Sequence, residues 1–551
     1  MFRTRTATSV ACIVLMASLA AAQPARRAEP PARADILRGE YGPFRANNDL
    51  RAYHLTIRVD PDKREVRGTN AITFRMLKDD TRIRLDLYAN LNVDGILFNG
   101  APLDYQRELN AVWVDFPETL QAGKDYSIEF KYSGTPLQMG RFGGFTFGTD
   151  PAGRPWMFTA CEGEGSSLWW PGKDQWHDEP DDGMVISVEA PNGLTDVSNG
   201  RFEGKADLGD GFTRWDWSVH YPINSYDVSL NIGAYKHFSD RLGDLTLDFY
   251  ALPEDLDKAR AQFAQAKTML KAFEHYFGEY PFAKDGYKLV QVPYSGMEHQ
   301  SAVTYGNRFA NGYLERDWTG VGISPKFDFI IIHESAHEWF GNAVSAADVS
   351  DMWIHEGWAT YLESLYVEYR WGTEDAMEYM SGYKAKVQNR RPIISPRGIH
   401  RTPPQDMYFK GALFLNTLRH VVDNDARWWT LVRNTYQHFK YRNIMTEEMI
   451  RFFGEQTGME LTPIFDQYLR HTDLPTLELR FTGDAVAYRW KADEDAFAMP
   501  IRVGRPGHWQ VIRPTTDRWQ SMPLSAPPDQ FEVATDWYYV NVSKQGIASE
   551  H

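Results

Sequence analysis

The sequence predicts a multidomain α+β protein in which a mainly helical domain lies between two β-rich domains. Three observations carry this prediction. Apolar and polar residues alternate between residues 46 and 240, helix-forming residues dominate 241–473, and short strand patterns return over 474–548. The chain has 551 residues, which is enough for about three domains with sizeable cores.

The N-terminus has the pattern of a secretory signal peptide over residues 1–22. Arg3 and Arg5 precede an apolar stretch, and three alanines at 20–22 provide a cleavage site. The apolar stretch is too short to span a membrane, although a short membrane anchor is the alternative. We therefore expect an exported protein, periplasmic or extracellular, with no stable membrane insertion after cleavage.

The next two segments differ in pattern. Residues 23–45 are rich in Pro, Ala and Arg without periodicity, which predicts a linker. From residue 46 to 240 the alternation seen in YHLTIRV (53–59) recurs between Gly- and Pro-rich turns. This segment is predicted to form an open, largely antiparallel sheet domain.

Helical character begins near residue 252, where Ala, Lys and Leu replace the β-branched runs. An apolar stripe between Phe263 and Phe273 has helical spacing, so 241–473 is predicted to be mainly helical. Residues 474–548 contain short strands separated by Gly, Pro and Asp, which predicts a small β-sandwich.

Charge and cysteine content exclude several classes of protein. The net charge is −15, and removal of the signal peptide with its two arginines brings it to −17. So acidic a chain is not expected to bind nucleic acid or anionic membranes. Cys12 leaves with the signal peptide, so Cys161 remains alone. An intramolecular disulfide and a cysteine-based zinc site are therefore excluded.

The segment FIIIHESAHEWFGNAV (329–344) places His333 and His337 four residues apart around Glu334. On a helix both imidazoles share one face and can bind one Zn²⁺ ion, while Glu334 lies beside the metal as a general base. The alternative is a buried helix in which this spacing arose by chance.

Zinc requires a third protein ligand. Eighteen residues separate His337 from Glu356, which lies early in a predicted second helix and between aromatic residues. We expect Glu356 to be the ligand. Glu363 is the competitor because it lies two turns later on the same face, and His355 is expected to be structural.

The stretch HESAHEWFGNAVSAADVSDMWIHEG resembles the M1 family of zinc aminopeptidases, the gluzincins, and two further stretches support this resemblance. SGMEH resembles the family's GxMEN motif, which implies that Glu298 binds the substrate α-amino group and that Met297 shapes the adjacent pocket. Ser295 and His299 depart from that motif.

The second stretch, MYFKGALFLNTL, resembles the family's YxKGA helix, which implies that Tyr408 stabilises the oxyanion during catalysis. A weaker resemblance covers FTACEGEGSSLWWPGKDQWHDEP, where Glu162 would join Glu298 at the substrate amine. Here Ala160 replaces the glutamine of the family.

The resemblance implies a saddle-like N-terminal β domain, a thermolysin-like catalytic domain and a C-terminal β-sandwich. It corresponds to a short form without the large helical domain that roofs the active site in many members. We therefore expect an open cleft or one closed by a second subunit, as in a homo-oligomer.

The expected function is an exported zinc aminopeptidase that hydrolyses the N-terminal peptide bond of peptides with a free N-terminus, by a zinc-activated water. The alternatives are a zinc endopeptidase of the thermolysin type and a peptide-binding protein without turnover.

Overall fold

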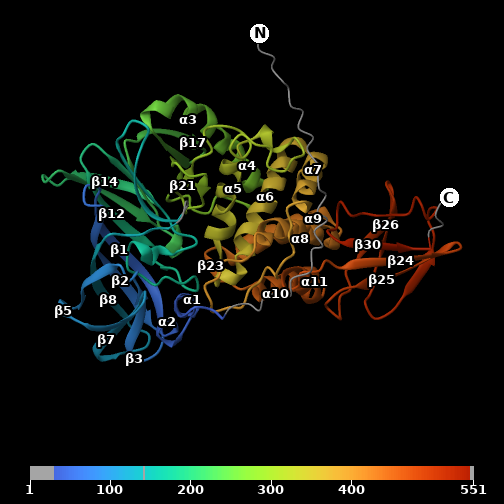
Figure 1. Ribbon diagram of the computed structural model, residues 1–551, viewed down its shortest axis with the longest axis horizontal. Helices are drawn as coiled ribbons and strands as arrows, with labels where there is room; N and C mark the ends of the chain where they lie inside the picture. The colour runs from blue at the N-terminus through green and yellow to red at the C-terminus, as the bar shows by residue number, and fades with distance from the viewer. Residues whose placement is uncertain (1–29, 140–142, 547–551) are drawn as a thin grey trace, which may run out of the picture.

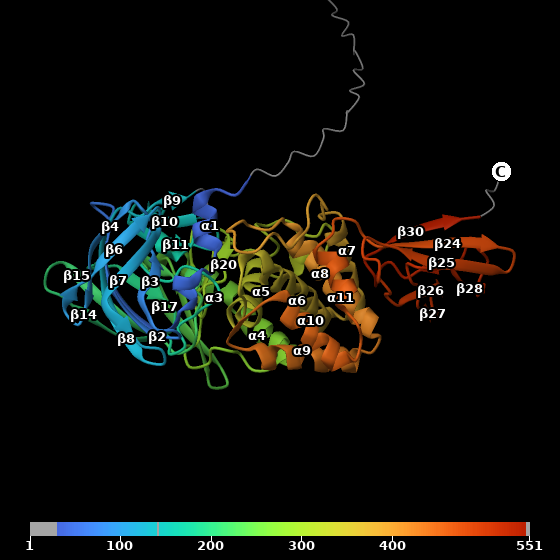
Figure 2. The same ribbon diagram turned by 90° about the horizontal axis from the view of Figure 1, so that it is seen from below.

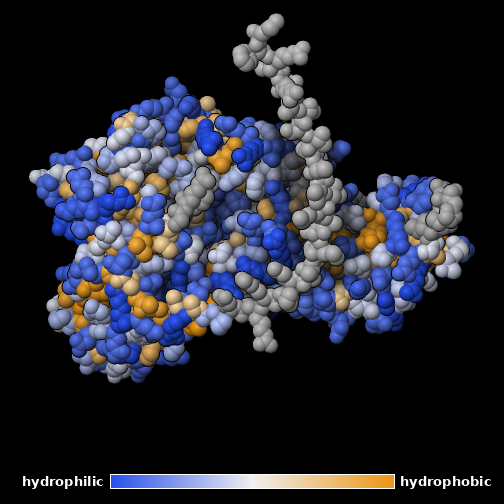
Figure 3. Space-filling model, viewed as in Figure 1, coloured by the Kyte–Doolittle hydropathy of each residue, from blue (hydrophilic) through white to orange (hydrophobic). Residues whose placement is uncertain are grey.

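The computed structural model describes residues 30–139 and 143–546, which form an N-terminal β-rich body, a helical centre and a C-terminal body of small sheets (Figure 1). The three bodies follow one another along the long axis of the molecule, with the helical centre between the other two (Figure 2). The face seen in Figure 3 is mostly hydrophilic, in line with the 74 acidic and 59 basic residues of the chain.

The N-terminal body is built on an eight-stranded sheet. Its neighbours are antiparallel except for one central pair, which is parallel and places Tyr53 opposite Met184. The side chains of residues 53, 55, 57 and 59 are buried, as the alternation predicts. The strands in spatial order are β14 (Arg201–Asp207), β15 (Phe212–Val219), β12 (Met184–Pro191), β1 (Asn48–Asp60), β2 (Glu65–Met76), β8 (Asp125–Gly134), β4 (Leu91–Phe98) and β5 (Ala101–Pro102).

Two smaller sheets complete this body, and one of them leads to the candidate site. The turn that follows β11 carries Glu162. The five-stranded sheet has the order β13 (Thr195–Ser198), β16 (Leu230–Gly233), β11 (Pro155–Ala160), β10 (Gly143–Thr149) and β9 (Gln138–Met139). The three-stranded sheet has the order β3 (Asp80–Asp86), β7 (Ala111–Leu120) and β6 (Asp104–Glu108).

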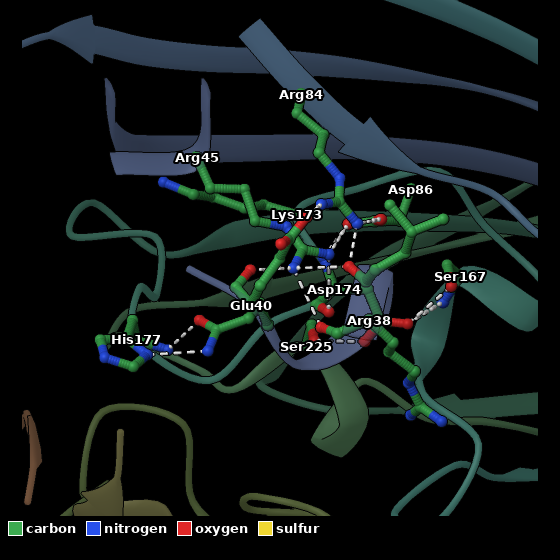
Figure 4. Close-up of polar contacts among 12 residues, drawn as sticks. Arg38, Glu40, Arg45, Arg84, Asp86, Ser167, Lys173, Asp174, His177 and Ser225 are labelled. Carbon is green, nitrogen blue, oxygen red and sulfur yellow. Dashed lines mark hydrogen bonds and ion pairs between the residues drawn. The ribbon is translucent and has the colours of Figure 1, made fainter. Parts of the chain in front are cut away.

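The linker predicted over residues 23–45 is wrong for its second half, and residues 23–29 lie outside the described chain. Two short helices, α1 (Arg33–Gly39) and α2 (Pro43–Ala46), pack on the N-terminal body instead. The Arg45 side chain is fully buried, 2.6 Å from the Asp86 carboxylate, and it also donates to backbone carbonyls of α1 (Figure 4). The helices are too short to show a periodicity in the sequence, and a buried charge pair leaves no apolar signal.

The central body contains a sheet as well as helices. β17 (Lys236–Leu242) pairs with β18 (Leu245–Ala251), which runs parallel to β19 (Tyr287–Gln291), followed by β21 (Val303–Tyr305) and the edge strand β20 (Gly296–Met297). β17 therefore crosses the boundary predicted at residue 240 and belongs to the sheet of the central body. Alternation alone does not tell which sheet a strand joins.

The helices surround a central helix whose residues from Trp353 to Val367 are all buried. α6 (Trp353–Trp371) packs against α5 (Phe329–Ala336), α7 (Thr373–Lys384) and α8 (Asp406–Val422). The remaining helices are α3 (Leu256–Phe263), α4 (Gln265–Phe277), α9 (Asp425–Phe439), α10 (Thr446–Thr457) and α11 (Thr462–Leu469). Over the described residues, none of the helices has the length and apolarity needed to cross a membrane.

The C-terminal body consists of two small sheets attached to α8. The Tyr539 backbone N–H donates to the Thr417 hydroxyl, and Tyr538 donates to the His420 carbonyl. One sheet has the order β28 (Gln520–Pro523), β25 (Ala485–Lys491), β24 (Thr476–Thr482) and β30 (Asn541–Gln545); the other has β27 (His508–Ile512), β26 (Ile501–Arg505) and β29 (Glu532–Val533).

Candidate active site

The segment HESAH (333–337) forms the second half of α5 and the turn that follows it, at the centre of the molecule (Figure 1). α5 begins where the Asp328 carboxylate accepts hydrogen bonds from two backbone N–H groups of the first turn. His333 and Glu334 lie on the helix, and His337 ends it. Gly341 follows with φ of 132°, and a Cβ there would lie 2.9 Å from His337 Nδ1, so glycine leaves room for the imidazole.

The three predicted metal ligands come together between α5 and α6. Glu356 Oε2 lies 3.4 Å from His333 Nε2 and 3.4 Å from His337 Nε2. Atoms bound about 2.1 Å from a tetrahedral ion lie about 3.4 Å apart, so this spacing fits one zinc ion. Glu356 Oε2 is buried and accepts no hydrogen bond within the described chain, as expected of an oxygen that requires a cation.

Each histidine presents its Nε2 atom to the metal site because its Nδ1–H already donates a hydrogen bond. The Nδ1–H of His333 donates to Glu363 Oε1 over 2.8 Å, and the Nδ1–H of His337 donates to the Phe340 carbonyl over 3.2 Å. Both Nε2 atoms therefore carry a free lone pair toward the metal site. Two imidazoles and one carboxylate are a donor set typical of catalytic zinc with an open fourth position.

Glu363, the competing ligand in the sequence, faces the other side of His333. Its Oε1 accepts from His333, and its Oε2 accepts from the phenols of Tyr379 and Tyr383. It is fully buried and orients a ligand rather than binding the metal. The seven-residue spacing from Glu356 indicates the shared helix face, but the sequence does not show that α5 supplies the partner.

Glu334 lies beside the metal ligands and borders a cavity that opens to solvent. Burial raises the pKa of the Glu334 carboxyl to about 7. The cavity has a volume of about 260 Å³, and aromatic residues such as Trp318 and Tyr408 form part of its wall. A carboxyl with a pKa near neutrality can both accept and return a proton at physiological pH.

The SGMEH segment (295–299) contains the edge strand β20 and packs against α5 beside Glu334. A Cβ on Gly296 would lie 2.9 Å from the Glu334 side chain, so glycine allows the strand to pack against α5. Glu298 is buried, and one of its carboxylate oxygens lies within 4.8 Å of donor atoms of Glu334 and His337. Met297 is buried in β20 and is not among the described residues that line the cavity.

Glu162 approaches the site from the N-terminal body. Burial and the neighbouring carboxylates, first that of Glu298, raise the pKa of Glu162 well above its usual range. The carbonyl of the next residue, Gly163, accepts hydrogen bonds from Arg38 of α1 and from His400. The turn that carries Glu162 is therefore held by both bodies. Ala160 is buried at the end of β11.

Tyr408 reaches the site from the first turn of α8. Its hydroxyl donates to Glu356 Oε1 over 2.7 Å, and its ring stacks near His333 at 6.1 Å between centroids. α6 and α8 approach closely at two glycines, because a Cβ on Gly411 would lie 3.0 Å from the Gly357 Cα. This approach brings the phenol to the edge of the metal site.

Comparisons with known proteins identify the family to which the chain is similar. The family model described as peptidase M1 N-terminal domain matches residues 50–226, and the peptidase family M1 domain matches 261–468. Aminopeptidase Ey of Gallus gallus is 24% identical over 67% of this chain, and aminopeptidase N of Mus musculus is 25% identical over 53%. The matches span 42% and 32% of the lengths of those two relatives.

Solved structures show the same fold. An M1 zinc metallopeptidase variant from Deinococcus radiodurans, bound to a Tyr-Ser-Ala substrate, has a TM-score of 0.63 at 22% identity. The match covers 78% of this chain and 96% of that one. The resemblance seen in the sequence is confirmed by the family models, which together cover most of the chain, so this protein belongs to peptidase family M1.

Proposed function

We propose that this protein is a zinc aminopeptidase that removes the N-terminal residue from peptides with a free α-amino group. The observation that carries this proposal is the position of Glu298. Its buried carboxylate lies within 4.8 Å of donor atoms of the general base Glu334 and the ligand His337. A carboxylate so close to the metal site can pair with an N-terminal ammonium and fix the first peptide bond at the reacting centre.

His333, His337 and Glu356 would hold the zinc ion. When bound, zinc would supply Lewis-acid chemistry, polarising the scissile carbonyl and lowering the pKa of a water. Glu363 keeps the Nε2 lone pair of His333 available for this role.

Two residues of the chain would handle protons and developing charge. The Glu334 carboxylate can accept a proton from the attacking water and return it to the leaving nitrogen. The Tyr408 phenol, which donates to Glu356 Oε1 in this structure, can donate instead to the oxyanion of the substrate.

The two alternatives differ in what they require on the amine side of the metal. A thermolysin-type endopeptidase needs open space there for residues that precede the cleaved bond. Here Glu298 and Glu162 occupy that side, which favours an exopeptidase. A peptide-binding protein without turnover would not need Glu334 and Tyr408 at the metal site.

The decisive experiment compares two peptides that differ only in N-terminal acetylation, with and without a zinc chelator. Cleavage of the free-amine peptide alone, lost on chelation and restored by zinc, supports the proposal. Equal cleavage of both peptides supports an endopeptidase. Absence of cleavage with zinc bound supports a binding protein.

We also propose two finer assignments. The protein is exported by cleavage of residues 1–22, which is tested by N-terminal sequencing of the protein recovered outside the cytoplasm. The segment 474–548, which the structure describes as far as residue 546, forms a β-sandwich. The two sheets support this assignment, because they carry buried apolar residues such as Leu477 and Val503.

A further inference from the structure

The amine-binding carboxylate is held by a chain of hydrogen bonds that begins next to a metal ligand. Tyr226, in a short 3-10 turn of the N-terminal body (Ser225–Asp227), donates its O–H to Glu298 Oε1 over 3.0 Å. The same phenol oxygen lies 3.3 Å from His355 Nδ1. His355 immediately precedes the ligand Glu356 on α6.

A backbone N–H group fixes the donor and acceptor of each hydrogen bond in this series. The N–H of Ala346, in β22 (Val344–Ala346), donates to His355 Nε2 over 2.8 Å. Nε2 is therefore an acceptor, and in a neutral imidazole the hydrogen is then on Nδ1. Nδ1–H donates to the Tyr226 oxygen, so the single hydrogen of the phenol is directed to Glu298.

Aromatic packing holds the members of this chain in place. The Trp176 ring stacks on His355 with centroids 5.1 Å apart and 7° between planes, and on Tyr226 at 5.1 Å. Tyr226 and His355 are fully buried. Trp176 and Tyr226 belong to the N-terminal body and His355 to the central body. The series of hydrogen bonds therefore lies where the two bodies meet.

We infer that Tyr226 and His355 are positioning residues for substrate binding, because they direct Glu298 Oε1 into one fixed hydrogen bond and leave its second oxygen for the substrate ammonium. The Asn342 amide holds the Glu298 backbone carbonyl over 2.7 Å, which fixes the other end of the residue. Through His355, the helix that supplies the ligand Glu356 also orients the amine-binding carboxylate. This inference rests on the proposed function.

The test compares Tyr226→Phe with the control Tyr436→Phe. Tyr436 is also fully buried, but its hydroxyl donates to the Glu279 carbonyl, outside the described site. With free-amine peptides we expect Tyr226→Phe to raise KM about tenfold, the effect of losing a hydrogen bond to a charged group. The kcat value should change little, and the control should leave both constants unchanged.

A double-variant comparison separates positioning from a structural role. In a Glu298→Gln background, where the ammonium has already lost its charged partner, adding Tyr226→Phe should not raise KM further. An equal tenfold effect in both backgrounds, or a loss of kcat with an unchanged KM, would overturn the inference. His355→Phe preserves a ring against Trp176 and leaves the Tyr226 hydroxyl free to donate to Glu298, so it should raise KM less than Tyr226→Phe does.

Crystal structures of the wild type and of Tyr226→Phe provide a readout that does not depend on activity. A displaced Glu298 carboxylate supports the chain of hydrogen bonds, and an unmoved carboxylate overturns it. If the wild type cleaves free and acetylated peptides equally, the proposed function fails, while the position of Glu298 in the two crystals still tests the hydrogen-bond chain.

Discussion

Replacement of Glu363 by glutamine is predicted to weaken zinc binding without removing a metal ligand. Glu363 Oε1 lies 2.8 Å from His333 Nδ1, and its other oxygen accepts two phenols, so all its contacts stabilise a carboxylate. Glutamine retains the size but loses the charge that makes the His333 imidazole a stronger ligand. Loss of such a partner typically costs 10- to 100-fold in metal affinity, about 1.4–2.7 kcal/mol.

The assay is a zinc competition titration against a chromogenic chelator at fixed pH. Glu378→Gln is the matched control, because Glu378 is an exposed carboxylate on α7. The control should bind zinc as tightly as the wild type. An unchanged Kd in Glu363→Gln would refute the orienting role. A loss far beyond 100-fold would identify Glu363 as a ligand itself and refute the assignment of Glu356.

Three further predictions concern catalysis, stability and pH. Tyr408→Phe should lower kcat about 100-fold in steady-state kinetics, while metal analysis should find full zinc content. A reduced zinc content would instead show that the hydrogen bond from Tyr408 to Glu356 supports the metal site. Arg45→Met should destabilise the protein by about 3 kcal/mol in urea unfolding, because Asp86 stays buried without its nearest partner. Arg33→Met is the control, because Arg33 and Glu108 form an exposed pair, and it should change the stability far less. Burial raises the pKa of Asp196 to about 8 from 3.8, so over this range the unfolded chain releases a proton that the folded chain keeps. Asp196 should therefore contribute a fall in stability as the pH rises from about 4 to about 8, and Asp196→Asn should make the slope in urea melts shallower. Other buried carboxyls with raised pKa values, such as those of Glu179 and Glu338, keep part of the slope. A slope identical to that of the wild type would exclude a contribution from Asp196.

The metal site could be predicted because its information is local. The spacing of His333 and His337 is a property of one helix, and Glu356 lies in the first turn of the next. Their convergence requires only that these two helices pack together, as the apolar residues around them indicate. The β-rich N-terminal body and the helical centre were predictable for the same reason, since alternation and helical stripes are read within short windows.

The features of the fold and site that could not be predicted depend on contacts between residues that are distant in sequence. Arg45 is buried because Asp86 and backbone carbonyls of α1 accept its hydrogen bonds, and the local sequence around Arg45 does not indicate these partners. Glu363 shares a face of α6 with Glu356, which suggests a place near the metal site, but its partner His333 lies on α5. Tyr226 precedes Glu298 by 72 positions, and its role depends on how two bodies pack. β17 reads as an ordinary strand, and its sheet is decided by its pairing with β18.

The packing of the two bodies also brings residues of the N-terminal body to the metal site. The helical centre alone carries the metal ligands, Glu334 and Glu298. The N-terminal body adds Glu162 on a turn that Arg38 and His400 hold from both sides, and it adds the Tyr226 hydroxyl to Glu298. Both additions lie beside Glu298. On the proposed function, a shift of one body against the other would therefore change the fit of the substrate amine before it changed the metal ligands.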